Sequence, residues 1–298
     1  MSTFNGVQVA VIGAGNMGGA MLARLCEAGW TVAVCDVDPR RQALAVACGA
    51  QDCSTPSDAA QLLLAEGVLL IAVIDAQQTR DVLTGPNGAM NAMHSGQTVM
   101  LCPTLSPIDV QAMGSMLAQH GLSCIDAPMS GGPLRARDGS MSLMVACEDG
   151  VFQRHVGLLN TLSQKIFRIS ERIGDGAKTK LVNNLLAAIN LSGAAEALAL
   201  ADRLGLNLDT TLSVMAQSSG QSWIASDRMP RAFVGDLAPR AHVTLLEKDT
   251  RLAVEMAQSA GFDPAIGQLA RQAFAQASAD GWADQDDASL FQWMKDHR

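Results

Sequence analysis

The chain has 298 residues, of which 48% are hydrophobic and 17% charged, and its formal net charge at neutral pH is -8. This length suits one large domain or two of ordinary size, and the apolar content is sufficient for a sizeable core. The acidic balance excludes a non-specific grip on nucleic acid or on an anionic membrane, because both need an excess of Lys and Arg. A small-molecule substrate fits this charge better.

The seven cysteines are scattered through apolar segments without a CxxC pair, and no two of the five histidines show metal-ligand spacing. We therefore expect reduced, mostly buried thiols in a cytoplasmic protein, and no bound metal. The N-terminus lacks the basic segment of a signal peptide and enters an apolar strand at Val7. The longest aliphatic run, residues 68–74, is far shorter than the roughly 20 residues that span a bilayer, which predicts a soluble protein.

Short apolar runs alternate with helix-length segments through the first half of the chain. Strand, helix and strand in this order build a mostly parallel sheet with helices on both faces, because parallel neighbours need long crossover connections. The runs that we predict as strands are residues 7–12, 31–36, 68–74, 97–102, 122–127 and 141–147.

Near residue 176 the pattern changes to helices only. The sequence therefore predicts an α/β fold with a Rossmann-type dinucleotide-binding domain over residues 1–172, followed by an all-helical domain for substrate binding and oligomerisation over residues 173–298. Breaks between the later helices are expected at Gly205, Gly220, Pro230, Pro239 and Pro264.

The helical part opens with one long helix, predicted over residues 177–204, which would be on the order of 40 Å long at 1.5 Å per residue. Its central residues carry few charges, so we expect it to be buried nearly all round, between two domains or two subunits. This feature predicts a homodimer or homotetramer.

The stretch VIGAGNMG, residues 11–18, places Gly13, Gly15 and Gly18 in the GxGxxG spacing, directly after a strand and at the start of a helix. In that context the glycines allow a tight turn, close approach of a pyrophosphate to the backbone, and close packing of helix on strand. The free N–H groups of the helix N-terminus then face the phosphates. A glycine turn without a ligand is the alternative interpretation.

The second predicted strand ends at Asp36, where a carboxylate accepts hydrogen bonds from the adenosine ribose hydroxyls. Asp36 would repel a 2'-phosphate, which favours NAD over NADP. Arg40 and Arg41 follow closely and could bind such a phosphate, so NADP stays open as the alternative cofactor.

Lys180 and Asn184 lie four residues apart at the start of the long helix, hence on one face of it. An alcohol that is oxidised by hydride transfer must lose its hydroxyl proton, and a lysine whose pKa is lowered by burial can take part in that transfer. Asn184 could donate to the same oxygen or fix the lysine. Alternatively, Lys180 and its neighbour Lys178 are ordinary surface cations.

Three small residues, Ser130, Gly131 and Gly132, stand between two apolar runs in DAPMSGG, more than a simple turn requires. Together with VIGAGNMG, with GAKTKLVNN (176–184), EALALADRLGL (196–206) and EKDTRLA (247–253), this motif makes the chain resemble the β-hydroxyacid dehydrogenase family of the 6-phosphogluconate dehydrogenase superfamily. The resemblance runs nearly end to end.

The resemblance implies a role for each matching residue. Lys180 is implied as the catalytic lysine and Asn184 as the asparagine that orients the substrate, while the small residues of DAPMSGG would receive the substrate carboxylate. The implied substrate-binding residues are Ser130, Gly131, Gly132 and Trp223. Beside the glycines and Asp36, the implied cofactor-binding residues are Ala14, Asn16, Met17, Val73, Ile74, Gln78, Thr104 and Lys248.

The activity implied by the resemblance is NAD-dependent oxidation of a small 3-hydroxy acid of the 3-hydroxyisobutyrate or the L-threonate and sugar-acid type. Residues 218–236 look closer to the L-threonate branch, although Trp223 could equally be a core aromatic residue with Arg228 as a surface ion partner. LCPTLSP departs from the common form of the loop that carries Thr104, which leaves the role of that residue open. The alternatives are an NADPH-preferring reductase of tartronate or succinic semialdehyde, and a non-catalytic NAD-binding scaffold. Imine reduction usually goes with a different residue at the lysine position.

Overall fold

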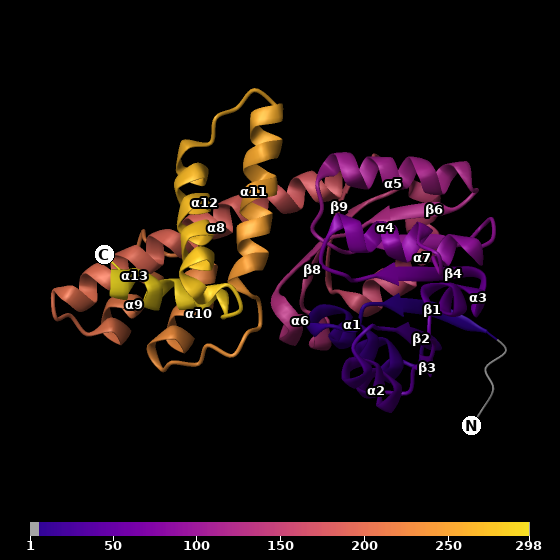
Figure 1. Ribbon diagram of the computed structural model, residues 1–298, viewed down its shortest axis with the longest axis horizontal. Helices are drawn as coiled ribbons and strands as arrows, with labels where there is room; N and C mark the ends of the chain where they lie inside the picture. The colour runs from indigo at the N-terminus through magenta and orange to yellow at the C-terminus, as the bar shows by residue number, and fades with distance from the viewer. Residues whose placement is uncertain (1–5, 298) are drawn as a thin grey trace. The chain divides into compact units, whose positions relative to one another are not determined.

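The structure is a computed structural model that describes residues 6–297, and it consists of two compact units that divide after Lys180 (Figure 1). The first unit alternates strands and helices. Its strands are β1 (Val7–Ile12), β2 (Val32–Cys35), β3 (Gln51–Asp52), β4 (Leu63–Ile71), β5 (Thr98–Leu101), β6 (Ser123–Asp126), β7 (Met129–Ser130), β8 (Ser142–Ala146) and β9 (Lys165–Ser170). Its helices are α1 (Asn16–Glu27), α2 (Pro39–Ala47), α3 (Pro56–Gln61), α4 (Ala76–Thr84), the short 3-10 turn η1 (Ala89–Asn91), α5 (Pro107–Gln119), α6 (Gly132–Asp138) and α7 (Asp149–Leu162).

The strands of the first unit form one sheet in the order β3-β2-β1-β4-β5-β6-β8-β7, with β9 paired to β8. The strands from β3 to β6 pair in parallel, whereas β8 runs antiparallel to both β6 and β7. The order reverses after β1, since the chain crosses from β3 back past β1 to β4. Such a switch point leaves a crevice at the carboxyl ends of the strands, where α/β proteins bind nucleotides.

Both faces of the sheet are covered by helices. Val9 and Val11 of β1 point into a core shared with α1, α6 and α7, whereas Ala10 and Ile12 point into a second core shared with α3, α4 and α5. This alternation is the two-residue period of a strand, and burial on both sides explains why β1 is apolar from Val9 to Ile12.

The predicted α/β class and all six predicted strands are confirmed. The run at residues 7–12 is β1 itself, and the other five overlap β2, β4, β5, β6 and β8. The prediction missed the two-residue strands β3 and β7 and the strand β9. Lys165 and Arg168 make β9 polar, because it lies at the edge of the sheet and no apolar pattern marks it.

The second unit is helical. Most of the long helix α8 (Asp175–Arg203) belongs to it, followed by α9 (Leu208–Ala216), α10 (Trp223–Phe233), α11 (Val243–Ser259), α12 (Ala265–Ala277), the π-helical turn η2 (Ser278–Trp282), the 3-10 turn η3 (Asp287–Ser289) and α13 (Leu290–His297). Leu191, Ala195 and Leu198 of α8 enter its core beside Phe274 of α12 and Phe291 of α13. The predicted break at Pro230 is wrong, because α10 continues through that residue to Phe233. Pro230 lacks an N–H, so the carbonyl of Ser226 four residues earlier loses its helical partner, but the helix continues for one more turn.

The expectation that the long helix is buried nearly all round is also wrong for the single chain. Val182, Leu186 and Leu200 are more than half exposed along one side of α8. By length and composition, α8 is the one helix in the described part of the chain that could cross a bilayer. The core helix of a soluble protein passes the same test, and the packing of Leu191, Ala195 and Leu198 assigns α8 to a protein core.

Candidate active site

The glycine loop between β1 and α1 has the geometry that its sequence predicts. Gly13 adopts a φ of +93°, a conformation that L side chains rarely adopt, and its N–H donates to Cys35 of the neighbouring strand. A Cβ atom on Gly18 would lie 1.9 Å from the carbonyl oxygen of Gly13. Helix α1 can therefore approach β1 closely only with glycine at position 18, and the positive end of its dipole lies at this loop, where an anion is favoured.

Asp36 follows β2 directly and reaches back to the glycine loop. Its Oδ2 accepts a hydrogen bond from Ala14 N at 2.5 Å, and its Oδ1 accepts one from Asp38 N at 2.7 Å. A hollow of about 340 Å³ lies beside the loop and is lined by Ala14, Gly15, Asn16, Gly19, Ala20, Arg41, Leu44, Ala45 and Cys48. Its walls combine helix N–H groups, a cation and apolar side chains, which fits the phosphate and adenosine part of a dinucleotide.

Further predicted cofactor residues follow the next two strands of the sheet. A side-chain carbon of Val73, just after β4, lies 3.2 Å from the position that a Cβ of Gly13 would take. Gln78, in the first turn of α4, is fixed to this loop because its Oε1 accepts from Ile74 N at 3.0 Å. Thr104 follows β5, the strand beside β4. The carboxyl ends of parallel neighbours share one edge, so these residues border the crevice that the glycine loop opens.

The DAPMSGG segment continues this edge after β6. Ser130 pairs with Ser142 of β8, while Gly131 and Gly132 adopt φ angles of +135° and +75°. A Cβ atom on Gly132 would meet nothing within 4 Å, so the backbone conformation and not crowding requires glycine there. Open space beside a glycine backbone at the start of α6 is a suitable site for a small anion.

Asp126 ties this edge to the start of α8. It is the last residue of β6 and almost fully buried, and its Oδ2 accepts from Gly174 N at 2.9 Å and from Ala177 N at 3.1 Å. Gly176 must be a glycine here, because a Cβ would lie 2.9 Å from the carboxyl carbon of Asp126 and 2.8 Å from a backbone oxygen of Met144. The strand that leads into DAPMSGG thereby holds the helix that carries Lys180.

Burial raises the pKa of Asp126 from its ordinary 3.8 to about 6, although the N–H groups of Ala177, Gly174 and Gly176 oppose the shift. A pKa that is raised in the folded protein means that folding favours the protonated acid. We expect this group to lower the free energy of unfolding as the pH rises from about 4 to about 6, by roughly 2 to 3 kcal/mol.

Urea unfolding of the wild type and of Asp126→Asn at several pH values between 4 and 7 checks this, because the difference between the two curves isolates the one group. The difference should change across that window and stay constant above it. A difference in the free energy of unfolding that stays constant between pH 4 and 7 would contradict the raised pKa of Asp126.

Lys180 and Asn184 are both buried, with 8% and 7% of their surfaces exposed, although both side chains are polar. Lys178 differs, since its Nζ lies 2.8 Å from Asp175 Oδ1 and its side chain is half exposed. The Lys178 hydrogen bond is the main cause of the low pKa of Asp175, about 2. Lys178 is thus the surface cation of the alternative interpretation, whereas Lys180 is placed in a desolvated setting as a catalytic lysine would be.

Two residues of α11 join Asn184. Its Nδ2 donates to Asp249 Oδ2 at 2.6 Å, and Lys248 Nζ lies 3.2 Å from Asp249 Oδ1. Trp223 opens α10 behind the N-cap Ser222 and is 43% exposed, so it is not the core aromatic of the alternative interpretation. Arg228 pairs with the buried Asp287, 2.7 Å away.

Sequence reasoning did not single out Asp126 or Asp249. The signal in the sequence is that each is an acid inside a family motif, DAPMSGG for Asp126 and EKDTRLA for Asp249. In the described part of the chain, no group of three or more His, Cys, Asp or Glu side chains could hold a metal ion. All seven cysteines are free, and Cys35, Cys53, Cys102 and Cys147 are buried.

The comparisons with known proteins agree with this geometry. Residues 8–170 match the family model described as the NAD binding domain of 6-phosphogluconate dehydrogenase, and residues 174–294 match the model described as NAD-binding of NADP-dependent 3-hydroxyisobutyrate dehydrogenase. With the glycine loop at the switch point of a parallel sheet, these matches define an NAD(P)-dependent oxidoreductase.

Similar proteins extend over nearly the whole chain. An L-threonate dehydrogenase of Cupriavidus necator is 34% identical over 95% of this chain and 94% of its own length. A 3-hydroxyisobutyrate dehydrogenase of Pseudomonas aeruginosa is 33% identical over 91% and 93%. The crystal structure of a 3-hydroxyisobutyrate dehydrogenase from Salmonella typhimurium superimposes with a TM-score of 0.88 at 32% identity, covering 96% of this chain and 99% of that one. The chain belongs to the β-hydroxyacid dehydrogenase family, and it is an enzyme that oxidises a hydroxy acid with a nicotinamide cofactor.

Proposed function

We propose that this enzyme oxidises a small 3-hydroxy acid of the L-threonate type, with NAD as the acceptor. The burial of Lys180 and Asn184 on one helix face carries the proposal, because a desolvated lysine beside an amide matches the removal of a hydroxyl proton. L-threonate is favoured over 3-hydroxyisobutyrate because several relatives at 31 to 34% identity are L-threonate dehydrogenases. Residues 1–172 would be the dinucleotide-binding domain, and residues 173–298 the helical domain for substrate binding and oligomerisation.

In this proposal the backbone around Ser130, Gly131 and Gly132 binds the substrate carboxylate, and Lys180 binds the hydroxyl that reacts. The neutral amine of Lys180 accepts the hydroxyl proton and later releases it to solvent. Asn184 donates a hydrogen bond to the same oxygen. A nicotinamide cofactor held by the glycine loop and Asp36 would supply the redox chemistry, as the acceptor of the hydride from the carbinol carbon.

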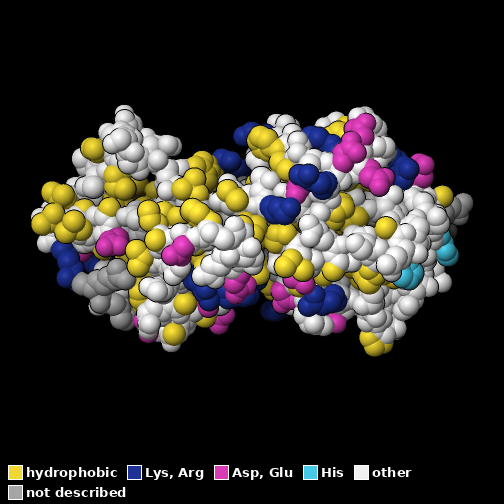
Figure 2. Space-filling view, turned by 90° about the horizontal axis from the view of Figure 1, so that it is seen from above, with side chains coloured by type: hydrophobic (Ala, Val, Ile, Leu, Met, Phe, Trp, Pro, Cys, Tyr) yellow, Lys and Arg dark blue, Asp and Glu magenta, His cyan; other side chains and the backbone are white. Residues whose placement is uncertain are grey.

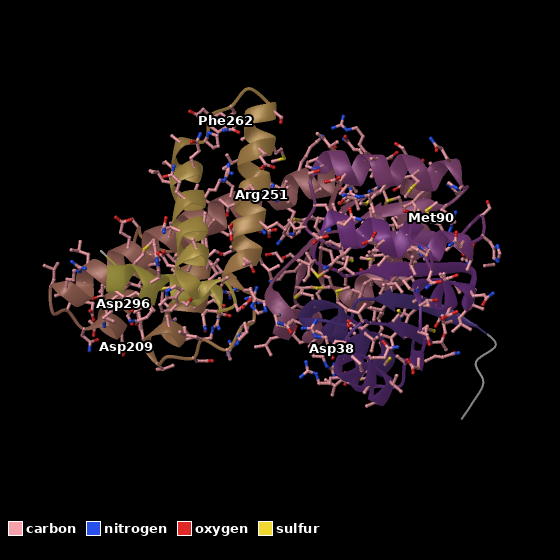
Figure 3. All side chains as sticks on the ribbon, in the orientation of Figure 1. Asp38, Met90, Asp209, Arg251, Phe262 and Asp296 are labelled. Carbon is pink, nitrogen blue, oxygen red and sulfur yellow. The ribbon has the colours of Figure 1, made fainter. Side chains whose placement is uncertain are left out.

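The preference for NAD over NADP rests on Asp36 and Asp38. Asp38, labelled in Figure 3, caps α2. It pairs with Arg40 at 3.2 Å and with Arg41 at 3.8 Å, so both arginines are partly neutralised. The Arg40 hydrogen bond also keeps the pKa of Asp38 below its ordinary value. Two carboxylates around the adenosine ribose would repel a 2'-phosphate more strongly than Asp36 alone.

The test follows NADH or NADPH absorbance while the enzyme and either cofactor meet L-threonate, 3-hydroxyisobutyrate, glycerate, L-serine and 3-hydroxypropionate. We expect the highest kcat/KM with NAD and L-threonate. Faster turnover of 3-hydroxyisobutyrate would assign the enzyme to the 3-hydroxyisobutyrate type instead. A reaction seen only with NADPH and tartronate or succinic semialdehyde would favour the reductase, and NAD binding without turnover of any acid would favour the scaffold.

We also propose a cytoplasmic homodimer or homotetramer. Within the second unit, Val182 and Leu186 of α8 and Ile266 and Leu269 of α12 are each more than half exposed. The start of α12 lies against α8, since a Cβ on Gly267 would be 2.7 Å from a side-chain carbon of Leu185. Hydrophobic side chains are frequent on the surface of this unit (Figure 2). An apolar patch of this kind favours contact with a second copy of the chain.

Light scattering at micromolar concentration checks the subunit contact. The wild type should scatter as a dimer or tetramer, and the double variant Leu186→Glu and Leu269→Glu should scatter as a smaller species. Ile108→Glu changes an equally exposed apolar residue on α5 of the first unit and should leave the mass unchanged. A monomeric wild type would contradict the proposal.

A further inference from the structure

Asn184 and Asp249 form a buried pair within the second unit. Nδ2 of Asn184 on α8 donates to Oδ2 of Asp249 on α11 at 2.6 Å, and each residue is only 7% exposed. Hydrogen bonds to a charged group are stronger than those between neutral groups, and a buried one is costly to break. This contact therefore holds the Asn184 side chain in one position.

The carboxylate also determines which end of the Asn184 amide faces it. An ionised carboxylate only accepts hydrogen bonds, so it faces the NH2 group and leaves Oδ1 on the other side. There Oδ1 accepts from Nδ2 of Asn183 at 3.1 Å. The carbonyl oxygen and one of the two N–H bonds of Asn184 are thus engaged within the protein. One N–H bond is left for a ligand.

The second carboxylate oxygen of Asp249 leads to Lys248. Lys248 Nζ lies 3.2 Å from Asp249 Oδ1, close enough for an ion pair. In the described structure no donor meets the geometry of a hydrogen bond to that buried oxygen. Asp249 therefore has two neighbours through which it can influence catalysis, the amide of Asn184 and the ammonium group of Lys248. An experiment has to separate these two routes.

We propose that Asp249 is a positioning residue, which orients the Asn184 amide so that its remaining N–H is offered to the reacting oxygen of the substrate. The inference rests on the proposed function, in which Lys180 and Asn184 act on one hydroxyl group. That oxygen keeps a lone pair for an N–H donor while it changes from hydroxyl to carbonyl. A flipped amide would present its own carbonyl oxygen, which repels the carbonyl that forms.

The first variant is Asp249→Asn, which fills the same space but can face Asn184 with either an oxygen or an NH2 group. We expect kcat for the preferred acid to fall about 10- to 100-fold, as small losses of orientation at reacting groups do, with a smaller change in KM for the acid. Glu255→Gln is the matched control. It removes an acid from the same helix, but its partner is Arg251, labelled in Figure 3, and both side chains are exposed. With this control kcat should not change.

The second variant exchanges the two residues. Asn184→Asp alone places two carboxylates against each other and should lower the thermal midpoint, more at pH 8 than at pH 5. Adding Asp249→Asn restores an amide-to-carboxylate hydrogen bond, so the midpoint should return to near the wild-type value. The exchanged enzyme should nevertheless stay as inactive as Asn184→Ala, because residue 184 then offers no N–H. If the pair of residues 184 and 249 served stability alone, activity would return together with the thermal midpoint.

Double-variant comparisons identify the route. Asp249→Asn should cost little further activity in an Asn184→Ala background, and its usual cost in a Lys248→Ala background. The reverse result would mean that Asp249 acts through Lys248 and would overturn the proposal, as would an exchanged enzyme with restored turnover. A wild type that oxidises no hydroxy acid would refute the proposed function and this inference with it, whereas an active wild type with additive losses would refute the inference alone.

Discussion

Replacing Lys180 with Ala should lower kcat for the preferred hydroxy acid by about 100- to 10,000-fold, the range that a positioned proton acceptor contributes. The hydroxyl proton would then have no acceptor other than water. The dissociation constant of NADH, measured by fluorescence titration, should stay within about twofold, because the glycine loop and Asp36 lie apart from Lys180 in the sequence and keep their hydrogen bonds. A melting curve of the variant checks that the fold survives the loss of this buried side chain.

The matched control is Lys178→Ala, on the same helix two residues earlier. Lys178 is half exposed and paired with Asp175, and exposed ion pairs contribute about 0 to 1 kcal/mol to stability. Its activity should be near that of the wild type. Near-normal turnover of Lys180→Ala would remove Lys180 from the mechanism. Recovery of Lys180→Ala by added methylamine would instead identify the missing group as an amine.

The features that the sequence predicts correctly are those that neighbouring residues along the chain determine. The run at residues 7–12 was placed as a strand because burial on both faces leaves no polar residue between Val9 and Ile12, and Gly13 ends it. The glycine loop was placed because only glycine tolerates a φ of +93° at Gly13 and the close approach at Gly18. In these cases the neighbouring residues along the chain contain the whole constraint.

Contacts between distant residues could not be predicted in this way. Asp126 is 51 residues from Ala177, and Asn184 is 65 residues from Asp249, and nothing in either local sequence names the partner. The long helix shows the same limit, because its low charge predicted burial on every side. Val182 and Leu186 are exposed in the single chain, which is consistent with a partner subunit that one sequence cannot specify.

Gly18→Ala and Gly15→Ala, both at the start of α1, should have different effects, the first on stability and the second on cofactor binding. A Cβ at Gly18 would lie 1.9 Å from a backbone oxygen and 3.0 Å from Ala72 Cβ, so α1 or β1 must shift. We expect this overpacking to cost about 3 kcal/mol or more and to lower the thermal midpoint by roughly 6 to 12 °C. Gly157→Ala in α7 is the control, because nothing lies within 4 Å of its Cβ position. It should be neutral or stabilising by roughly 0.5 to 1 kcal/mol.

Gly15→Ala should leave the fold intact and weaken cofactor binding. Gly15 has an ordinary φ of -63°, and its Cβ position is 3.2 Å from Arg41 Nη1, the end of a flexible side chain that can move away. The new methyl group would stand where a pyrophosphate must approach the helix N-terminus, so NADH affinity should fall about tenfold or more. Calorimetric titration with NADH and a melting curve measure both effects on one sample. If neither the NADH affinity nor the thermal midpoint changed, the pyrophosphate would have to bind elsewhere, because a methyl group on residue 15 would otherwise stand in its path.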